Sequence, residues 1–261
     1  MSIKRIIIPV AILLFIMHSK AQVNDNPIGE LSKRLMQNEM MSQRFFRNFV
    51  FIKTNTFKKK ALADMDKSLA RFDDNMEYFA MHLPADNTEI KEDFDKLNYF
   101  WSLYRLSITD YENSDYEKLI RKTKKFGKLM NEFITDMLQA HEDYGKNKKA
   151  LNIALLDAQN IKDIDNIAAS YVLKNAVDAY RDEKVFEVDF DGIAKRLKKI
   201  GKFKKTAALT REYVADLHNL LNMIKSTYYK NTYNPRMMFS NISGFSKKSY
   251  KILDIILNTI K

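Results

Sequence analysis

Cysteine is absent from the 261-residue chain, which excludes disulfide bonds, thiol chemistry, a lipoprotein anchor and C-x-x-C-H haem attachment. Glycine and proline are scarce, with six and four residues respectively. Because these two residue types punctuate turns and break helices, their scarcity favours long, uninterrupted helices. The alternation of apolar and polar residues that is typical of half-buried strands is also nearly absent. We therefore expect an all-α protein.

Histidine is nearly as rare, and the residues after position 21 include only His82, His141 and His218. None has a glutamate three positions earlier, which excludes the Glu-x-x-His motif of di-iron bundles, and neither H-E-x-x-H nor G-x-S-x-G occurs. We predict a protein that is not an enzyme and that holds no metal and no cofactor. The alternative is an enzyme whose site is assembled from scattered carboxylates and tyrosines.

The first 21 residues have the three parts of a signal peptide. Lys4 and Arg5 precede an apolar run of 12 residues at 6–17, which is shorter than the roughly 20 that a bilayer requires. Small side chains at Ser19 and Ala21 suit a signal peptidase, so we predict cleavage after Ala21 and a periplasmic or secreted location. An uncleaved N-terminal anchor is the alternative.

Residues 22–261 contain no second apolar run of transmembrane length. The formal charge of +11 falls to +8 without the three cations Lys4, Arg5 and Lys20. A basic balance commonly indicates nucleic acid, but export argues against that partner. Anionic envelope surfaces or acidic polymers fit an exported basic protein better, and general solubility explains the charge best of all.

Apolar residues recur with a heptad period along 62–79, at Leu62, Met65, Leu69, Phe72, Met76 and Phe79. A second apolar face follows at Leu119, Phe126, Leu129, Phe133 and Met137. Such faces need partner helices at shallow crossing angles. We predict an elongated up-and-down bundle of about eight helices, with breaks at 82–88, 110–114, 145–147, 178–191 and 231–235.

A weak internal repeat relates residues 128 positions apart. Asn38 then matches Asn166, and Ser42 matches Ser170. Amphipathic helices often match in phase by chance, so coincidence stays open beside true repetition. The repeat predicts two four-helix units in tandem, at 22–146 and 147–261.

Residues 187–192, Glu-Val-Asp-Phe-Asp-Gly, imitate the start of a calcium-binding loop. The twelfth position of such a loop is a bidentate glutamate, whereas this sequence has Lys198 there. A cation repels the ion that the loop would hold. We therefore expect Asp189 or Asp191 to be the N-cap of a helix.

The run 196–205, Arg-Leu-Lys-Lys-Ile-Gly-Lys-Phe-Lys-Lys, is amphipathic and strongly basic. One interpretation is a contact with an anionic surface or polymer. The other is a solvated helix face above buried Leu197, Ile200 and Phe203. The first interpretation makes an envelope-associated scaffold protein the alternative function.

Residues 28–44 read IGELSKRLMQNEMMSQR, and 61–72 read ALADMDKSLARF. This pair of segments resembles the opening helices of PilJ-type, NarX-like sensor domains, whose motif is approximately A-G-R-Q-R-M-L-S-Q-R. The resemblance covers about 50 residues and implies a periplasmic four-helix bundle that senses or binds. The arginine that grips the anion in nitrate sensors falls on Glu39, so we expect no nitrate binding in the family's manner.

The resemblance makes Arg34, Ser42, Gln43 and Arg44 the candidate ligand-binding residues. It implies a sensor-like binding or interaction module whose partner is a small ligand or a membrane signalling protein; a second copy of the chain is another candidate. The alternative is structural, since Leu31, Leu35, Asn38, Met41 and Phe45 fall on one helix face. In that case Ser42, Gln43 and Arg44 only cap or cross-link helices.

Overall fold

The computed structural model describes residues 27–181, 188–230 and 232–260, so the predicted signal peptide lies outside the described residues. The elements are α2 (Pro27–Lys53), α3 (Lys58–Met81), α4 (Thr88–Thr109), α5 (Tyr116–Ala140), α6 (Tyr144–Ala176), the 3-10 turn η1 (Asp178–Tyr180), α7 (Phe190–Gly201), α8 (Ala207–Tyr229) and α9 (Pro235–Leu257). No strand occurs in these ranges. The all-α prediction is confirmed.

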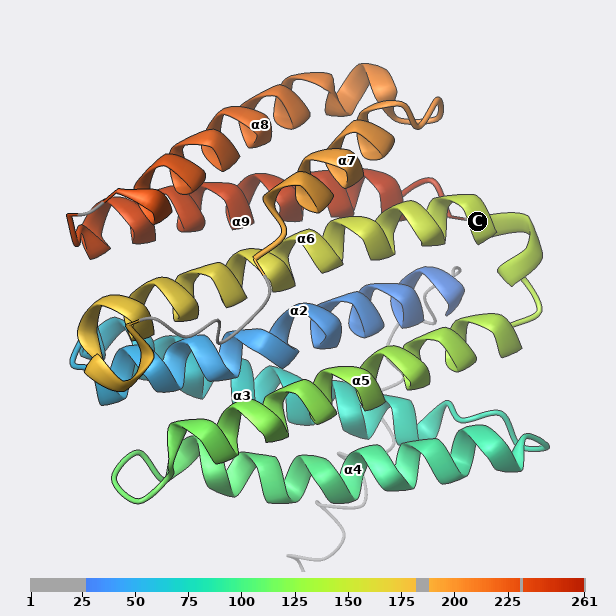
Figure 1. The fold of residues 1–261 in the computed structure, drawn as a ribbon. Helices are drawn as coiled ribbons and strands as arrows, with labels where there is room; N and C mark the ends of the chain where they lie inside the picture. Colours follow the sequence, from blue (N-terminus) through green and yellow to red (C-terminus); the bar gives the residue numbers. More distant parts are fainter. Residues whose placement is uncertain (1–26, 182–187, 231, 261) are drawn as a thin grey trace, which may run out of the picture.

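Consecutive helices run in opposite directions through the whole bundle (Figure 1). α2 packs on α3 and α5, and α4 packs on α5; α6 packs on α7 and α9, and α8 closes the second group against α7 and α9. The two central helices, α2 and α6, run parallel and pack against each other along their length. The predicted boundary at 146/147 falls in the first turn of α6, and one apolar core extends through both groups.

Polar caps set several helix starts. The side chains of Asn87, Asp115 and Asn234 accept hydrogen bonds from backbone N–H groups three residues later, which satisfies donors that a helix start leaves free. Pro235 opens α9, where its fixed φ suits the first helical position. Asn87 thus caps the helix that follows the predicted break at 82–88.

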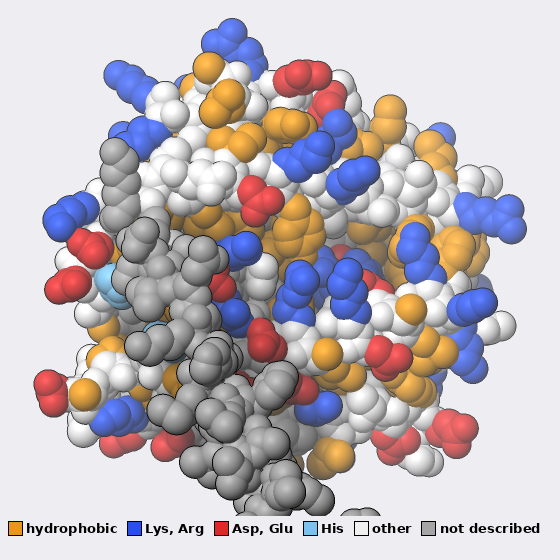
Figure 2. All heavy atoms as spheres, turned by 180° about the vertical axis from the view of Figure 1, so that it is seen from behind, with side chains coloured by type: hydrophobic (Ala, Val, Ile, Leu, Met, Phe, Trp, Pro, Cys, Tyr) orange, Lys and Arg blue, Asp and Glu red, His pale blue; other side chains and the backbone are white. Residues whose placement is uncertain are grey.

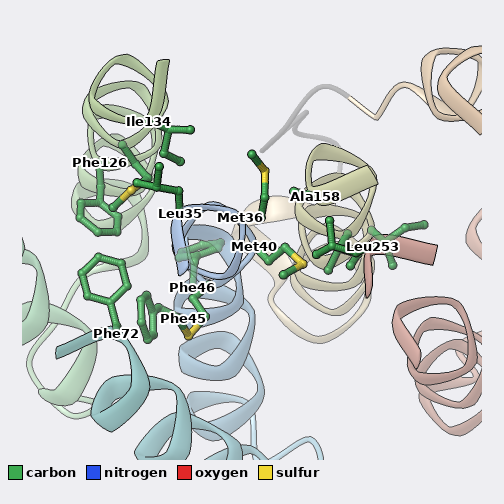
Figure 3. Close-up of a cluster of buried hydrophobic side chains, with 14 of the residues drawn as sticks. Leu35, Met36, Met40, Phe45, Phe46, Phe72, Phe126, Ile134, Ala158 and Leu253 are labelled. Carbon is green, nitrogen blue, oxygen red and sulfur yellow. The ribbon is translucent and has the colours of Figure 1, made fainter. Parts of the chain in front are cut away.

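The predicted apolar face of 62–79 is buried in α3, with Leu62 half-buried at its start. Phe72 lies in an aromatic group with Phe45, Trp101 and Phe126, and its ring centroid is 4.2 Å from that of Trp101. Figure 3 shows the rings of Phe45, Phe72 and Phe126 on one side of α2, while Met40 points to the other side, toward α6 and α9. α2 is therefore buried between the two groups of helices.

Two predicted details were wrong. The break expected at 145–147 lies at 141–143, because α6 already begins at Tyr144. The basic run 196–205 is not one continuous helix, since α7 ends at Gly201 and Thr206 precedes α8. Among the described helices, none combines the length and hydrophobicity that a membrane span requires.

Candidate functional site

α2 carries many polar side chains that the fold buries. The buried ones are Ser32, Asn38, Glu39, Ser42, Gln43, Arg47 and Asn48. Burying a polar or charged group is costly unless it gains hydrogen bonds or an opposite charge. The partners of these residues therefore show how this cost is offset. Several of the residues and their partners lie beside a cavity next to α2.

Arg47 is the centre of a buried ionic network. Its Nη1 donates to Oδ1 of Asp165 on α6 at 2.5 Å, and its Nη2 donates to Asp64 on α3. Asn48 donates from Nδ2 to the same Asp64 carboxylate at 3.0 Å and accepts from Arg47 Nε at 3.1 Å. The network thus ties α2 to both neighbours through charge-assisted hydrogen bonds.

Arg44 lies one turn earlier, with a side chain that is 13% exposed. Its Nε is 3.4 Å from Oδ2 of Asp165, and its guanidinium carbon is 5.7 Å from the centroid of the Tyr250 ring on α9. Among the described residues this is its only carboxylate contact within 4.0 Å. A guanidinium has five N–H donors, so Arg44 keeps donor capacity for a ligand.

The two arginines control the charge of Asp64. Burial alone would raise the pKa of this carboxyl, but the positive charges of Arg47 and Arg44 and the hydrogen bond from Asn48 lower it below its usual value of 3.8. For Arg44 the directions are reversed. Burial alone would lower the pKa of this guanidinium, but its interactions with Tyr250, Asp165 and Asp64 raise the pKa above its usual value. Asp64 and Arg44 are therefore both charged at neutral pH.

A cavity of about 360 Å³ opens beside this network, between α3 and α9 and above α2. We call it cavity A. Its walls are formed by Arg44, Arg47, Asn48 and Phe51 of α2, by Lys60, Ala61 and Asp64 of α3, and by Phe239, Ile242, Ser243, Ser246, Lys247 and Tyr250 of α9. Its volume is within the range of small-molecule sites.

Cavity A has two unlike ends. At one end the ring of Phe239 lies 6.1 Å from Phe51 and 5.0 Å from Phe57, between ring centroids. At the other end are Arg44 and Tyr250. The α9 residues from 239 to 250 recur at helical spacing, so the lined stretch is roughly 16 Å long at 1.5 Å per residue. The cavity is therefore elongated and amphipathic.

A smaller hollow of about 240 Å³, cavity B, adjoins cavity A and shares Arg44, Asp64 and Tyr250 with it. The cations that line the two cavities are Arg44, Arg47, Lys60, Lys67, Arg71 and Lys247. Set against the two carboxylates Asp64 and Asp165, these six cations leave an excess of four positive charges. Figure 2, which views the side where α3 and α9 lie, shows Lys and Arg side chains among hydrophobic ones near the centre of this face.

One neutral polar group on the wall also lacks a partner. The Oγ of Ser246 is buried and makes no hydrogen bond with any of the residues that the structure describes. A buried hydroxyl without a partner is costly, and a bound polar group would relieve that cost. Ser246 lies one helical turn before Tyr250, toward the charged end of cavity A.

Of the four predicted ligand-binding residues, only Arg44 lines cavity A. Arg34 is occupied by Glu30 at 2.8 Å and Asp74 at 2.7 Å, at the opposite end of α2 from Arg47. Ser42 donates to the carbonyl of Glu39 at 2.7 Å. Gln43 points toward α5, where a Cβ on Gly127 would be 3.1 Å from its Nε2. The structure does not bring the four together.

Glu39 takes part in a different contact. Its Oε1 accepts from Lys162 of α6 at 2.6 Å, and the glutamate is 2% exposed. Its other oxygen has no hydrogen-bond partner among the described residues. The residue that the resemblance sets against the anion-binding arginine of nitrate sensors is therefore a buried carboxylate with its own cation.

Sequence reasoning missed Arg47, Asp64, Asp165 and the α9 wall. One available signal was that Arg47 and Asn48 interrupt the apolar run from Phe45 to Ile52. A helix that is apolar on all faces is covered by its neighbours on all sides. Charged residues within it are then buried and need partners of opposite charge. The identity of those partners carried no local signal, because Asp165 lies 118 residues away.

The predicted cap at the calcium-like segment is confirmed at Asp189, whose Oδ1 accepts from the N–H of Gly192 at 2.7 Å. A Cβ at position 192 would lie 1.9 Å from Asp189 Oδ2, which accounts for the glycine. Glu187 lies outside the described residues. Within the described ranges, no group of three or more His, Asp or Glu side chains is arranged to hold a metal ion.

Fold and site together define an all-α protein with an internal ionic network and a cationic, amphipathic cavity at its side. Comparison with protein families, curated proteins and solved structures gave no match to this chain.

Proposed function

We propose that the protein is a non-enzymatic binding module that takes an elongated amphipathic anion in cavity A. The ligand's anionic group, a carboxylate in the simplest case, pairs with Arg44 and accepts a hydrogen bond from Ser246. Its apolar body lies along Ile242 toward Phe51 and Phe239. The observation that carries the proposal is a largely buried guanidinium with unused donors at one end of a cavity whose other end is aromatic.

Three further observations support an anion as the ligand. Lys60, Lys67, Arg71 and Lys247 face the two cavities without a carboxylate within 4.0 Å among the described residues. These four residues are exposed, and cations with no counter-charge nearby raise the local concentration of anions. Ser246 supplies an unused donor at the same end. The apolar wall favours a ligand with an apolar body, because burying apolar surface lowers the free energy of binding and a small inorganic anion has none to bury.

The resemblance to PilJ-type sensor domains agrees with this role, because α2 carries both the resembling segment and the floor of cavity A. We further propose that the protein is exported and serves a membrane signalling partner. A ligand that bridges α2 and α3 to α9 binds best to one packing of α9, and differential affinity of this kind is what a sensor needs.

A thermal shift series tests the proposal. Decanoate should stabilise the full chain by about 5–10 °C at a concentration near one hundred times its Kd, since that occupancy adds about 2.7 kcal/mol. Decanol, which is matched in length but neutral, should give a much smaller shift. Equal shifts from the acid and the alcohol would contradict an anion site.

Three variants locate the site. Ser243→Trp places a large side chain on the cavity wall at an exposed position and should abolish the decanoate shift without altering the ionic network. Arg44→Gln should weaken binding most, and Ser246→Ala less. Arg121→Gln, at an exposed surface pair, is the matched control and should bind normally. Normal binding by Ser243→Trp would rule out cavity A.

A further inference from the structure

The connection between α7 and α8 forms a basic corner at one end of the molecule, away from α2 (Figure 1). No acidic residue occurs between positions 192 and 211. The exposed cations of this segment, here called the α7–α8 corner, are Lys195, Lys198, Lys199, Lys202, Lys204, Lys205 and Arg211. None of them lies within 4.0 Å of a carboxylate in the part of the chain that the structure describes.

The corner also has an apolar component. A shallow groove of about 510 Å³ runs between α7 and α8, with Lys195, Lys198 and Arg211 on its rim. Its floor contains Val214, where α7 and α8 approach so closely that a Cβ on Gly201 would be 3.3 Å from its Cγ1. Leu209, in the first turn of α8, is 66% exposed. Cations thus surround apolar surface.

The combination of exposed cations and apolar surface favours one kind of polyanionic partner over another. Single-stranded nucleic acid is commonly held by exposed aromatic rings that stack on bases. The exposed tyrosines of the described residues, Tyr99, Tyr229 and Tyr233, lie on other segments, and Phe203 within the corner is buried. Lysines around an exposed leucine instead suit an anionic lipid surface, since the charges attract the headgroups while the apolar side chain enters the interface.

We propose that the α7–α8 corner binds the surface of an anionic phospholipid bilayer. The contact is peripheral, and no helix spans the bilayer in this proposal. It is independent of cavity A, because none of the residues that line cavities A and B belongs to α7 or α8. The protein would therefore bind its small ligand while held at a membrane surface.

Co-sedimentation of the full chain with vesicles tests the proposal. Binding to phosphatidylcholine vesicles containing phosphatidylglycerol should be strong at low salt and should fall steeply toward 0.5 M salt, because screening shortens the range of the attraction. Pure phosphatidylcholine vesicles should bind poorly. Each lysine near such a surface contributes about fivefold to partitioning.

The test variant replaces Lys198, Lys199, Lys202, Lys204 and Lys205 by Gln and should bind more than about tenfold more weakly. The control variant removes the same charge from exposed positions on α4 to α6, at Lys91, Lys118, Lys128, Lys148 and Lys149, and should lose far less. Circular dichroism should show that both variants are folded.

Equal losses in the two variants would overturn the proposal, since binding would then depend only on net charge. Unchanged binding by the corner variant would overturn it as well. Tight binding of a single-stranded oligonucleotide, lost in the corner variant, together with poor vesicle binding would replace the lipid by nucleic acid. Retention of vesicle binding by Ser243→Trp would separate this surface from cavity A.

Discussion

Arg47 of α2 donates from Nη1 to Oδ1 of Asp165 on α6 at 2.5 Å, and the two side chains are 9% and 0% exposed. The other carboxylate oxygen of Asp165 lies 3.4 Å from Arg44 Nε. One buried anion therefore serves two guanidiniums at the junction of the central helices. The wall of cavity A and the packing of α2 on α6 depend on the same carboxylate.

Replacing Asp165 by Ala should be strongly destabilising, because it leaves two largely buried cations without this partner. Removing one member of a buried pair costs about 3–5 kcal/mol in general. Urea unfolding at neutral pH measures the change. Glu117→Ala is the control, since its pair with Arg121 is exposed and should contribute little. Similar losses in both variants would show that the Asp165 network adds nothing to stability.

Asp157 of α6 should make the protein less stable as the pH rises. Burial raises the pKa of this carboxyl from 3.8 to about 8, with the Ser249 hydroxyl on α9 acting in the opposite direction. The folded state thus holds the proton more tightly than the unfolded state. The contribution of protonated Asp157 to the free energy of unfolding is fully present below about pH 4 and is lost progressively as the pH approaches 8.

The variant Asp157→Asn should lack this loss. The urea midpoints of wild type and variant are measured at about pH 5 and about pH 9. Between these pH values only the wild type should lose the part of its stability that protonated Asp157 contributes. The comparison cancels other titrating groups that the two proteins share. Identical pH dependence of the two would contradict an ionisable Asp157 in the α6–α9 interface.

Gly192→Ala should disrupt the N-cap of α7, because its Cβ would lie 1.9 Å from Asp189 Oδ2. Loss of an N-cap costs about 0.5–2 kcal/mol. Asp189→Ala should cost a similar amount, and the double variant should cost no more than either change alone, which urea unfolding can measure. Additive losses would show that the two residues act separately.

Nitrate should not stabilise the protein beyond an equal concentration of chloride. The resemblance to nitrate sensors sets Glu39 against their anion-binding arginine, and Glu39 is paired with Lys162 at 2.6 Å. A small inorganic anion also gains nothing from the apolar wall of cavity A. A nitrate-specific rise of several degrees in a thermal shift assay would contradict this expectation.

The helices themselves could be predicted because their signals are local. The face from Met65 to Phe79 is apolar at helical spacing, and Asn87 and Asp189 are capping residues just ahead of periodic segments. The end of α7 at Gly201 was missed because the basic, amphipathic pattern continues through Lys205. Pattern shows which face is buried more reliably than where a helix stops.

The site could be predicted only in part, for a geometric reason. Successive residues on a helix point about 100° apart, so Ser42, Gln43 and Arg44 cannot all face one cavity. Arg44 was identified through the resemblance, whereas Tyr250 and Asp165 come from helices distant in sequence. Whether residues 128 positions apart form a true repeat stays a prediction.

Cavity A has a consequence for biosynthesis. Its floor and one wall come from α2 and α3, but the opposite wall belongs to α9, more than 150 residues downstream. A nascent polypeptide therefore cannot form cavity A, or bind the ligand proposed for it, until translation has passed Tyr250 and α9 has docked. Ligand added to ribosome-bound fragments that stop before α9 would find no receptor, so occupancy reports that assembly is complete.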